Sequence, residues 1–305
     1  MRILICSDGT DPADKPTKLG GLLAGPCHAT TTLLGIAEQP ADEQPLRAAL
    51  ESEAELLRSS YGVSPEIVMM EGEPIRQILN VAAGSHYDIA IIGARPKGRT
   101  GLYWYSERTY EVIKAIPSPV LVVKGDFERL SSILVCTGGK QYIEDAVQLT
   151  GKLAACVGAS VTLLHVMAEP PAIFADLVRL EEDVDGLLAS NSELGVNLRA
   201  QKESLEKLGV TTRVRVRHGI ALDQIFAEVS EGNHDIIVTG SSQARGPLRH
   251  YIMGDLTRSI LNRSSCPVLV ARASPLSAKH GGFWNTLKAI FTSSPAVKVP
   301  EPITE

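Results

Sequence analysis

The sequence predicts an α/β protein built from two doubly wound domains, each with a five-stranded parallel sheet. Three observations support this fold class: short aliphatic runs alternate with longer helical stretches, the alternation occurs twice, and both copies keep the same order. Buried strands of a parallel sheet appear as nearly continuous aliphatic runs, and the helices between them cover both faces. The chain is therefore expected to be a tandem repeat of one fold.

The repeat is visible as matching residues at nearly constant offsets. The segment that begins at Ile3 recurs 130 positions later at Ile133, and the segment from Gly72 recurs 147 positions later at Gly219. The last aliphatic run, residues 118–125, recurs 148 positions later. The second copy therefore contains an insertion of 17 residues before its third strand.

The elements of each copy follow from these runs in order. In the second copy we expect strands at residues 132–136, 161–167, 214–218, 235–240 and 267–272, with helices at 143–159 and 221–233 among the segments between them. The first copy opens in the same way, with a strand at residues 3–6. In open α/β sheets, ligands bind at the carboxyl ends of the strands where the strand order reverses. The loops after the first and fourth strands of each copy are therefore the expected site.

The repeat divides the chain into two domains, residues 1–126 and 131–273, followed by a tail at residues 274–305. The join between the domains is short, so we expect them to dock rather than to swing freely. In the tail, residues 279–294 place aromatic and aliphatic side chains at helical spacing. We expect this amphipathic helix to pack on the protein or on a second subunit, and contact with a membrane surface is the alternative.

The composition excludes several classes of function. With 30 basic and 35 acidic residues, a net charge of −5 and no long basic run, the chain has no general electrostatic affinity for nucleic acid. No run approaches the ~18 apolar residues of a membrane-spanning helix. Because the first strand begins beside Met1, there is no room for a signal peptide, and we expect a cytoplasmic protein.

The residue types that carry chemistry are dispersed along the chain. The five cysteines form no CxxC pair and no metal-ligand spacing with histidine. Cys6 and Cys136 lie within aliphatic runs, where a small buried side chain is the expected role. None of the seven histidines has a spaced partner for acid-base work, so the sequence offers no catalytic constellation and no metal site.

Four stretches of the chain resemble the universal stress protein family. They are residues 3–10 (ILICSDGT), 161–167 (VTLLHVM), 235–242 (DIIVTGSS) and 265–272 (SCPVLVAR). The resemblance covers both predicted domains, and it implies an adenine nucleotide alpha hydrolase-like fold whose domains pair as dimers through their last strands. Some members of the family bind ATP: an Asp after the first strand holds the adenosine end, and a loop of the form G-x2-G-x9-G-[S/T] wraps the phosphates.

By this resemblance, the first copy offers a partial ATP site. Its candidate contacts are Asp8, Gly9, Thr10, Gly93, Arg95, Lys97, Arg99 and Ser106. Pro96 stands where the second glycine belongs and has no N–H to donate, and Glu107 places a negative charge where a hydroxyl residue belongs. The basic loop of Arg95, Lys97 and Arg99 would meet an anion by a different geometry, and ordinary surface charges are the other interpretation.

The second copy has lost other parts of the same site. Its remaining candidate contacts are Gly240, Gly246 and Gly254. Gln243 stands where the middle glycine belongs, ten residues rather than nine precede Gly254, and Asp255 takes the hydroxyl position. The Asp after the first strand has become Gly138. A nucleotide, where one binds, is therefore expected in the first copy.

Two functions follow from these residues. The first is a stress-response or regulatory protein that acts by binding a protein partner or itself, without enzymatic activity. The alternative is an adenine-nucleotide sensor or weak ATPase that uses Asp8 and the basic loop at residues 95–99, with ATP as its ligand. A protein that binds a dinucleotide or a flavin is disfavoured, because no G-x-G-x-x-G follows a first strand.

Overall fold

The computed structural model describes residues 1–9, 15–93, 107–138, 144–168, 184–243, 251–252 and 254–272. Residues 1–273 form one compact unit. None of the helices in the described ranges combines the length and the apolar character needed to cross a membrane. The amphipathic helix expected in the tail lies outside the described residues, so it stays a prediction.

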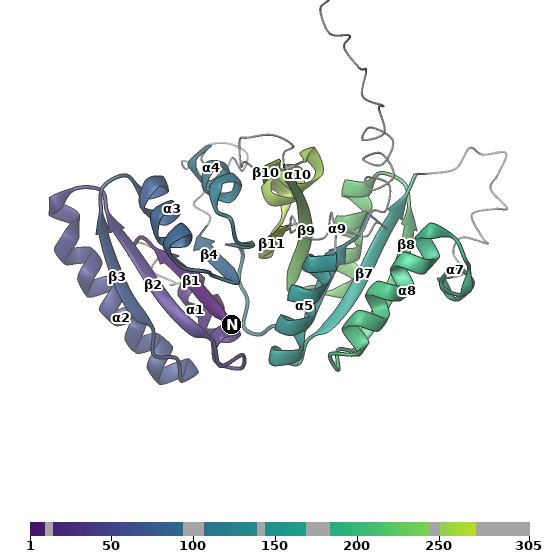
Figure 1. The fold of residues 1–305 in the computed structure, drawn as a ribbon, viewed down its shortest axis with the longest axis horizontal. Helices are drawn as coiled ribbons and strands as arrows, with labels where there is room; N and C mark the ends of the chain where they lie inside the picture. The colour runs from purple at the N-terminus through teal and green to yellow at the C-terminus, as the bar shows by residue number, and fades with distance from the viewer. Residues whose placement is uncertain are drawn as a thin grey trace, which may run out of the picture. The chain divides into compact units, whose positions relative to one another are not determined.

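The first half of the chain forms the five strands that the sequence predicts (Figure 1). Its elements are β1 (Arg2–Ser7), α1 (Lys15–Ala24), β2 (Thr30–Ala37), the short 3-10 helix η1 (Pro40–Asp42), α2 (Glu43–Tyr61), β3 (Glu66–Glu71), α3 (Pro74–Gly84), β4 (Ile89–Gly93), α4 (Glu107–Ala115) and β5 (Val120–Val123). Glu73 caps α3, because its carboxylate accepts hydrogen bonds from the amides of Ile75 and Arg76. The glycine Gly62 ends α2 in the left-handed conformation.

The second half repeats this order with two additions. Its elements are β6 (Ser132–Cys136), α5 (Glu144–Val157), β7 (Ser160–Met167), α7 (Val184–Ala189), α8 (Glu193–Glu206), β8 (Thr212–His218), α9 (Ala221–Gly232), β9 (Ile236–Gln243), β10 (Tyr251–Ile252), α10 (Asp255–Arg263) and β11 (Val268–Arg272). The additions are α7, which lies in the predicted insertion, and the short strand β10. The fourth strand of this half, β9, also runs three residues beyond its predicted end at Gly240.

The strands of both halves join in one sheet, in the order β3-β2-β1-β4-β5-β11-β9-β6-β7-β8, with β10 paired to β9 (Figure 1). Pairing within each half is parallel except for β10, so the predicted doubly wound fold is confirmed. The strand order reverses between β1 and β4 in the first half, and between β6 and β9 in the second. These two reversals are the positions at which an open α/β sheet opens a crevice for a ligand.

Both faces of the sheet are buried, and successive side chains of a strand point to opposite faces. Ile3 and Ile5 of β1 pack in the cluster beneath α1, α2, α5 and α8, whereas Leu4 between them packs beneath α3, α4, α9 and α10. This period of two follows from the pleat of a strand. Burial on both faces explains why the sequence shows aliphatic runs instead of an alternation of apolar and polar residues.

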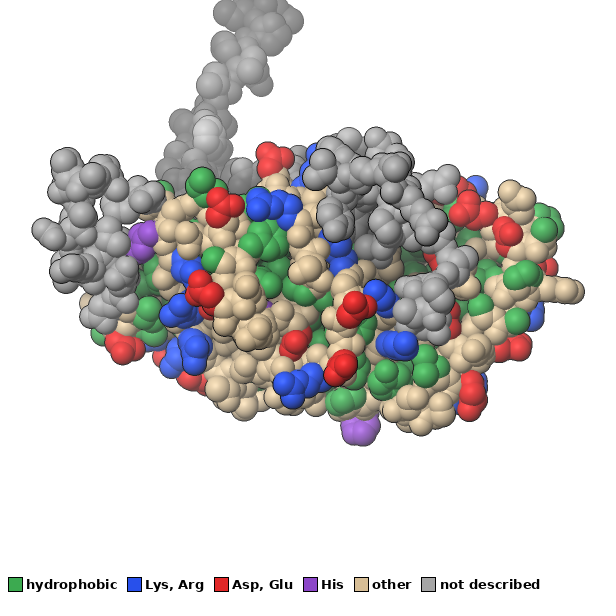
Figure 2. Space-filling model, turned by 180° about the vertical axis from the view of Figure 1, so that it is seen from behind, with side chains coloured by type: hydrophobic (Ala, Val, Ile, Leu, Met, Phe, Trp, Pro, Cys, Tyr) green, Lys and Arg blue, Asp and Glu red, His purple; other side chains and the backbone are tan. Residues whose placement is uncertain are grey.

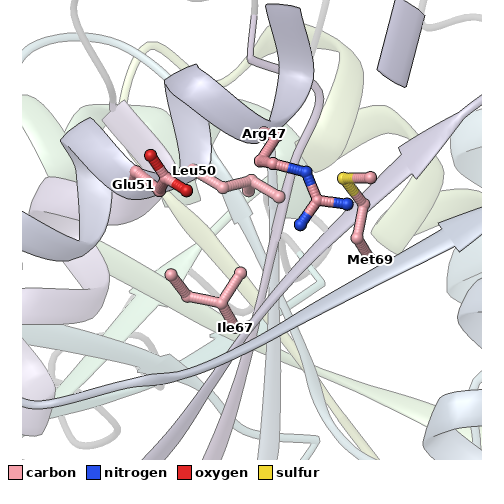
Figure 3. A pocket seen from close by; sticks show the side chains of 5 residues that line it. All are labelled: Arg47, Leu50, Glu51, Ile67 and Met69. Atoms are coloured by element: carbon pink, nitrogen blue, oxygen red, sulfur yellow. The ribbon is translucent and has the colours of Figure 1, made fainter. Parts of the chain in front are cut away.

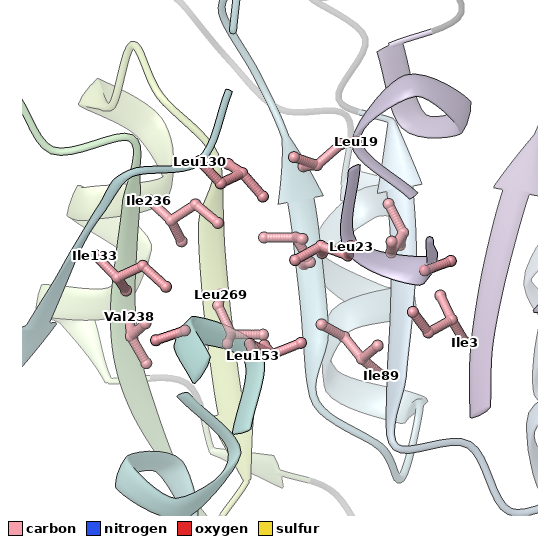
Figure 4. Packing of buried hydrophobic residues seen from close by; sticks show 14 of the residues in the cluster. Ile3, Leu19, Leu23, Ile89, Leu130, Ile133, Leu153, Ile236, Val238 and Leu269 are labelled. Carbon is pink, nitrogen blue, oxygen red and sulfur yellow. The ribbon is translucent and has the colours of Figure 1, made fainter. Parts of the chain in front are cut away.

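The two halves meet through their last strands. β5 and β11 pair antiparallel, with Val120 opposite Val270, and all residues of both strands are buried. On one face of this junction, Leu23 of α1 and Leu153 of α5 lie 130 positions apart and share one buried cluster (Figure 4). The last-strand pairing that the resemblance implies between subunits therefore occurs here within one chain.

Two basic side chains stabilise the junction, and each one binds the end of a helix in the opposite half. Lys124, which follows β5, donates from Nζ to the carbonyl of Leu261 at the end of α10, at 2.8 Å. Arg272, which lies 148 positions later at the end of β11, donates to the carbonyls of Ile113, Ile116 (3.2 Å) and Ser118 (3.3 Å) around the end of α4. The last carbonyls of a helix lack partners inside the helix and lie at its negative end, so a cation stabilises them. We call Lys124 and Arg272 the clasp.

Two further contacts at the junction depend on which residue types occupy these positions. The guanidinium of Arg258 lies over the ring of Tyr110, 5.4 Å from its centroid, and these residues are also 148 positions apart. Gly125 has a φ of +65°, and a Cβ atom there would lie 1.9 Å from the carbonyl oxygen of Ser265. The chain leaves β5 so close to the second half that only glycine fits at this position.

Replacing Arg272 by alanine should lower the free energy of unfolding by about 3 kcal/mol, because it leaves several buried carbonyls without a donor. Urea unfolding followed by circular dichroism measures this loss. The matched control is Arg47→Ala, which removes an arginine that is 58% exposed and should change the stability by less than about 0.5 kcal/mol. Equal losses in the two variants would contradict the clasp.

The burial of Lys124 should also impose a pH dependence on stability. Burial lowers the pKa of Lys124 from 10.5 to about 8. Between these two pH values the unfolded state binds more protons than the folded state, so the contribution of Lys124 to stability rises with pH across this window. The free energy of unfolding of the wild type should therefore gain on that of Lys124→Met between pH 7.5 and pH 9.5, as urea titrations at both pH values would measure. If the difference in free energy of unfolding between the two proteins is the same at both pH values, the pKa of Lys124 is not lowered in the folded protein.

Candidate functional site

The carboxyl ends of two adjacent strands come together in each half. In the first half Cys6 pairs with Ile92, so the chain from Ser7 to Gly9 emerges beside Gly93. In the second half Val135 pairs with Val238, so Gly138 emerges beside Gly240 in the same way. The structure thus brings Asp8, Gly9 and Gly93 to one edge of the sheet, at the position where the strand order reverses.

The turn after β1 is tightly built. Gly9 has a φ of +66°, and a Cβ atom there would lie 2.9 Å from the Cβ of Ala49 in α2. Its amide donates to the Oγ of Ser7 at 3.1 Å. Asp8, between these two residues, is exposed. The turn is therefore fixed by contacts with the protein, and the side chain of Asp8 in it is accessible to solvent.

A buried carboxylate lies behind this turn. Glu53 of α2 is 3% exposed and accepts hydrogen bonds from the hydroxyls of Ser7 (2.6 Å) and Thr17 (2.7 Å). Through these two hydrogen bonds, Glu53 of α2 ties the end of β1 to α1 and α2. Glu53 is not among the residues that the sequence predicts for the site. The sequence does contain an indication of its role. Glu53 lies on the same helical face as Leu50 and Leu57, and an acidic residue is unusual on an apolar face.

The second half builds the same connection with an amide in place of the carboxyl group. Leu50 and Leu57 correspond to Leu198 and Leu205 at an offset of 148, which places Gln201 at the position of Glu53. The hydroxyl of Thr137, the counterpart of Ser7, donates to the Oε1 of Gln201 at 3.1 Å. His165 also contacts this turn, through its Nδ1 and the carbonyl of Thr137 at 3.0 Å. The two halves therefore share this connection, but the buried acceptor is a carboxyl group in the first half and an amide in the second.

The fourth strand of the second half takes the place where a phosphate loop would begin. β9 continues through Gln243, and Ser242 and Gln243 pair antiparallel with Ile252 and Tyr251 of β10. The carbonyl of Gly240 accepts a hydrogen bond from the hydroxyl of Thr257, at 3.0 Å. Backbone groups that form a strand ladder are not available to surround a phosphate.

The start of α10 is the next part of the second-half site. Gly254 is the N-cap of α10, and its backbone is extended, with no side-chain cap. Asp255 follows in the first turn, where the partial positive charge of the helix favours a negative side chain. The helix end that would attract a phosphate therefore already carries a carboxylate.

The other predicted contacts lie outside the described residues: they are Thr10, Arg95, Lys97, Arg99, Ser106 and Gly246. Within the described part of the chain, no cluster of His, Cys, Asp and Glu side chains could hold a metal ion. The described portion of the site therefore consists of Asp8, Gly9 and Gly93 in the first half, with Gly240 and Gly254 as their partial counterparts.

A surface hollow of about 360 Å³ lies elsewhere in the first half, between α2 and the edge strand β3 (Figure 3). Its lining consists of Arg47, Leu50, Glu51, Ile67 and Met69. The guanidinium of Arg47 is bound to Glu43 at 3.1 Å, and Glu51 adds a carboxylate. This mixed lining does not have the excess positive charge that a polyphosphate requires, and it includes none of the predicted contacts.

Comparison with known proteins gives one consistent result. Residues 1–124 and 130–272 match the model of the universal stress protein family. Universal stress protein Slr1230 of Synechocystis is 23% identical over 189 residues, which cover 61% of this chain and 58% of that protein. A universal stress protein of Thermus aquaticus is 28% identical over 134 residues, which cover 40% of this chain and 97% of that protein.

Solved structures share the fold over both halves. A putative universal stress protein of Pseudomonas aeruginosa superposes with a TM-score of 0.67 at 18% identity, covering 91% of this chain and 95% of the other. A universal stress protein of Archaeoglobus fulgidus superposes with a TM-score of 0.60 at 16% identity, covering 90% and 98%. At this level of identity the likeness concerns the fold alone.

Removing the buried carboxylate should destabilise the first half. Glu53→Ala leaves the hydroxyls of Ser7 and Thr17 without their acceptor, so the free energy of unfolding should fall by about 3 kcal/mol. Glu55→Ala, two positions along the same helix, removes a carboxylate that is 69% exposed and should cost less than about 0.5 kcal/mol. Chemical denaturation of both variants measures the contrast, and a small loss for Glu53→Ala would show that Glu53 is not a structural tie.

Proposed function

Because the chain belongs to the universal stress protein family, we propose that it is a regulatory protein of the stress response that acts by binding rather than by catalysis. One observation carries this proposal: the pairing of β9 with β10 uses the backbone of the second half where a phosphate-wrapping loop would lie. The second half then serves as a structural partner for the first. A single ligand site per chain, in a body that presents a large surface, fits a binding protein.

A second function is favoured by the first half. The exposed carboxylate of Asp8 stands beside Gly93 at the reversal of strand order, where the resemblance expects the adenosine end of ATP. The second half has Gly138 at the equivalent position, without a carboxylate. We therefore propose, as the alternative, an adenine-nucleotide sensor or weak ATPase whose ligand binds the first half. The basic side chains Arg95, Lys97 and Arg99 would then meet the phosphates.

Self-association or a protein partner would use surfaces other than the last strands. β5 and β11 already pair with each other, and β3 and β8 lie at the two ends of the strand order. Basic and acidic side chains are interspersed over the face in Figure 2, which supports a partner other than nucleic acid. We also propose that the protein is cytoplasmic.

Nucleotide binding tests both proposals. Small molecules extracted from the purified full chain are identified by mass, and ATP is then titrated by calorimetry with and without Mg²⁺. If the sensor function is right, one ATP binds per chain, and Asp8→Ala weakens binding about tenfold or more through the loss of a charged hydrogen-bond acceptor. Gly138→Ala, at the equivalent position of the second half, should leave the affinity unchanged.

The outcomes separate the two proposals. Two ATP molecules per chain would refute the structural role of the second half. No binding at millimolar nucleotide would exclude the sensor and leave regulation through protein partners. Turnover of ATP at a rate that Asp8→Ala abolishes would overturn the proposal of a protein without catalytic activity.

A further inference from the structure

The strand β3 ends the sheet on the side of the first half, and the hollow described above lies beside it (Figures 1 and 3). Among the described residues, no strand pairs with the outer edge of β3. Ile67 of β3 is 39% exposed, and it lines the hollow together with Met69 and with Leu50 of α2. An edge strand offers its backbone amides and carbonyls to a further strand. The first half therefore combines an open strand edge with an apolar surface.

The second half covers the equivalent edge with its own chain. At an offset of 147, Ile67 corresponds to Val214 of β8, which lies at the other end of the strand order. Both α7, in the insertion of the second half, and α8 contact β8, and Val214 is only 6% exposed. In the first half, the three-residue η1 precedes α2 in place of such a helix. A surface that the chain itself covers in one half is thus left open in the other.

The charges beside the hollow lie at its two ends. In Figure 3 the guanidinium of Arg47 lies toward Met69, whereas the carboxylate of Glu51 lies on the side of Ile67. A two-fold axis through the edge of β3 places the Met69 end of one hollow opposite the Ile67 end of another. The Arg47 of each chain then approaches the Glu51 of the other chain. This surface is therefore complementary in charge to a second copy of itself.

We propose that two copies of this chain form a dimer by pairing antiparallel along β3, so that one sheet continues across both chains and both hollows are covered. Ile67 of each chain faces Met69 of the other, and Val68 faces Val68 on the two-fold axis. The backbone of the two edges then forms the ladder that each edge lacks alone. This inference rests on the self-association that the proposed function includes, and it assigns the surface.

The side chains of β3 select this register. Two residues that face each other in an antiparallel pair point to the same side of the sheet, so α2 of both chains lies on one side. A shift of two residues in one direction would set Ile67 against Glu71, and a shift in the other direction would set Val68 against Glu66. The register with Val68 on the axis keeps the aliphatic and methionine side chains of the strand together.

The edge of β8 does not support the same pairing. Its side chains on the α9 side are Arg213, Arg215 and Arg217. Two copies of β8 paired in the equivalent register would place Arg215 against itself and Arg213 against Arg217, and like charges in facing positions repel. Pairing β3 with β8 of another chain would set Val68 against an arginine. Association through β3 therefore stops at two chains.

Sedimentation velocity of the full chain, over a range of micromolar concentrations, measures the association. The wild type should have the mass of two chains at the upper concentrations. Ile67→Lys places an ammonium group opposite Met69 of the second copy, and it should weaken association about tenfold or more. Val196→Lys is the matched control, because Val196 of α8 is 41% exposed and lies in the other half. It should leave the association unchanged, and circular dichroism verifies that both variants fold.

A charge exchange tests the contact between the two hollows. Glu51→Arg sets two arginines against each other across the axis and should weaken the dimer. The double variant Arg47→Glu/Glu51→Arg restores opposite charges and should recover most of the association. Because each variant keeps the apolar residues of β3, a loss followed by recovery reports the contact between chains rather than a failure to fold.

A cross-link tests the register. Val68→Cys places two thiols in facing positions of the antiparallel pair, within reach of a disulfide. After treatment with oxidised glutathione, peptide masses should show a link between position 68 of one chain and position 68 of the other. Arg215→Cys, at the equivalent position of β8, should give no such link.

The outcomes separate this surface from the proposed function. A dimer that tolerates Ile67→Lys, or that forms no link at position 68, would overturn the surface and leave self-association in place. A wild type that stays monomeric at every concentration would overturn both. Assemblies of more than two chains would contradict the closed pairing. The nucleotide titration tests the ligand site independently of these results.

Discussion

The antiparallel pairing of β5 with β11 is the interaction on which the rest of the structure depends. It joins two sheets along strands that are buried on both faces, and an isolated half would expose this edge to solvent. The same pairing brings Lys124 and Arg272 to the helix ends of the opposite half. It also sets α1 against α5. The clasp and the contact between these two helices are consequences of this one register.

The two halves can differ in sequence, because each half always pairs with the other half of the same chain. At an offset of 147, Arg217 and Glu228 of the second half stand where Met70 and Val81 stand in the first. Arg217 donates to the nearly buried Glu228 at 2.6 Å, so one half stabilises this face with an ion pair and the other with apolar packing. The turns after β1 and β6 also differ, because the buried acceptor is the carboxyl group of Glu53 in one half and the amide of Gln201 in the other.

The sequence was sufficient for the fold, because aliphatic runs at constant offsets specify buried strands whatever their partners. It was insufficient for the end of β9, since Ser241 becomes part of a strand through its pairing with Arg272, far away in the sequence. Glu53 was missed for a related reason. Its place on an apolar stripe marks it as unusual, but its partner Ser7 is 46 positions away and only the folded chain brings them together.

The contact of Tyr110 with Arg258 determines which halves are compatible. These residues occupy equivalent positions, so each one faces its own counterpart across the junction. Two second halves paired in the same manner would bring Arg258 against Arg258, and like charges in close contact repel. Two first halves would bring tyrosine against tyrosine and lose the attraction of a cation for a ring. The junction therefore favours the pairing of a first half with a second half. It disfavours the pairing of two identical halves from different chains.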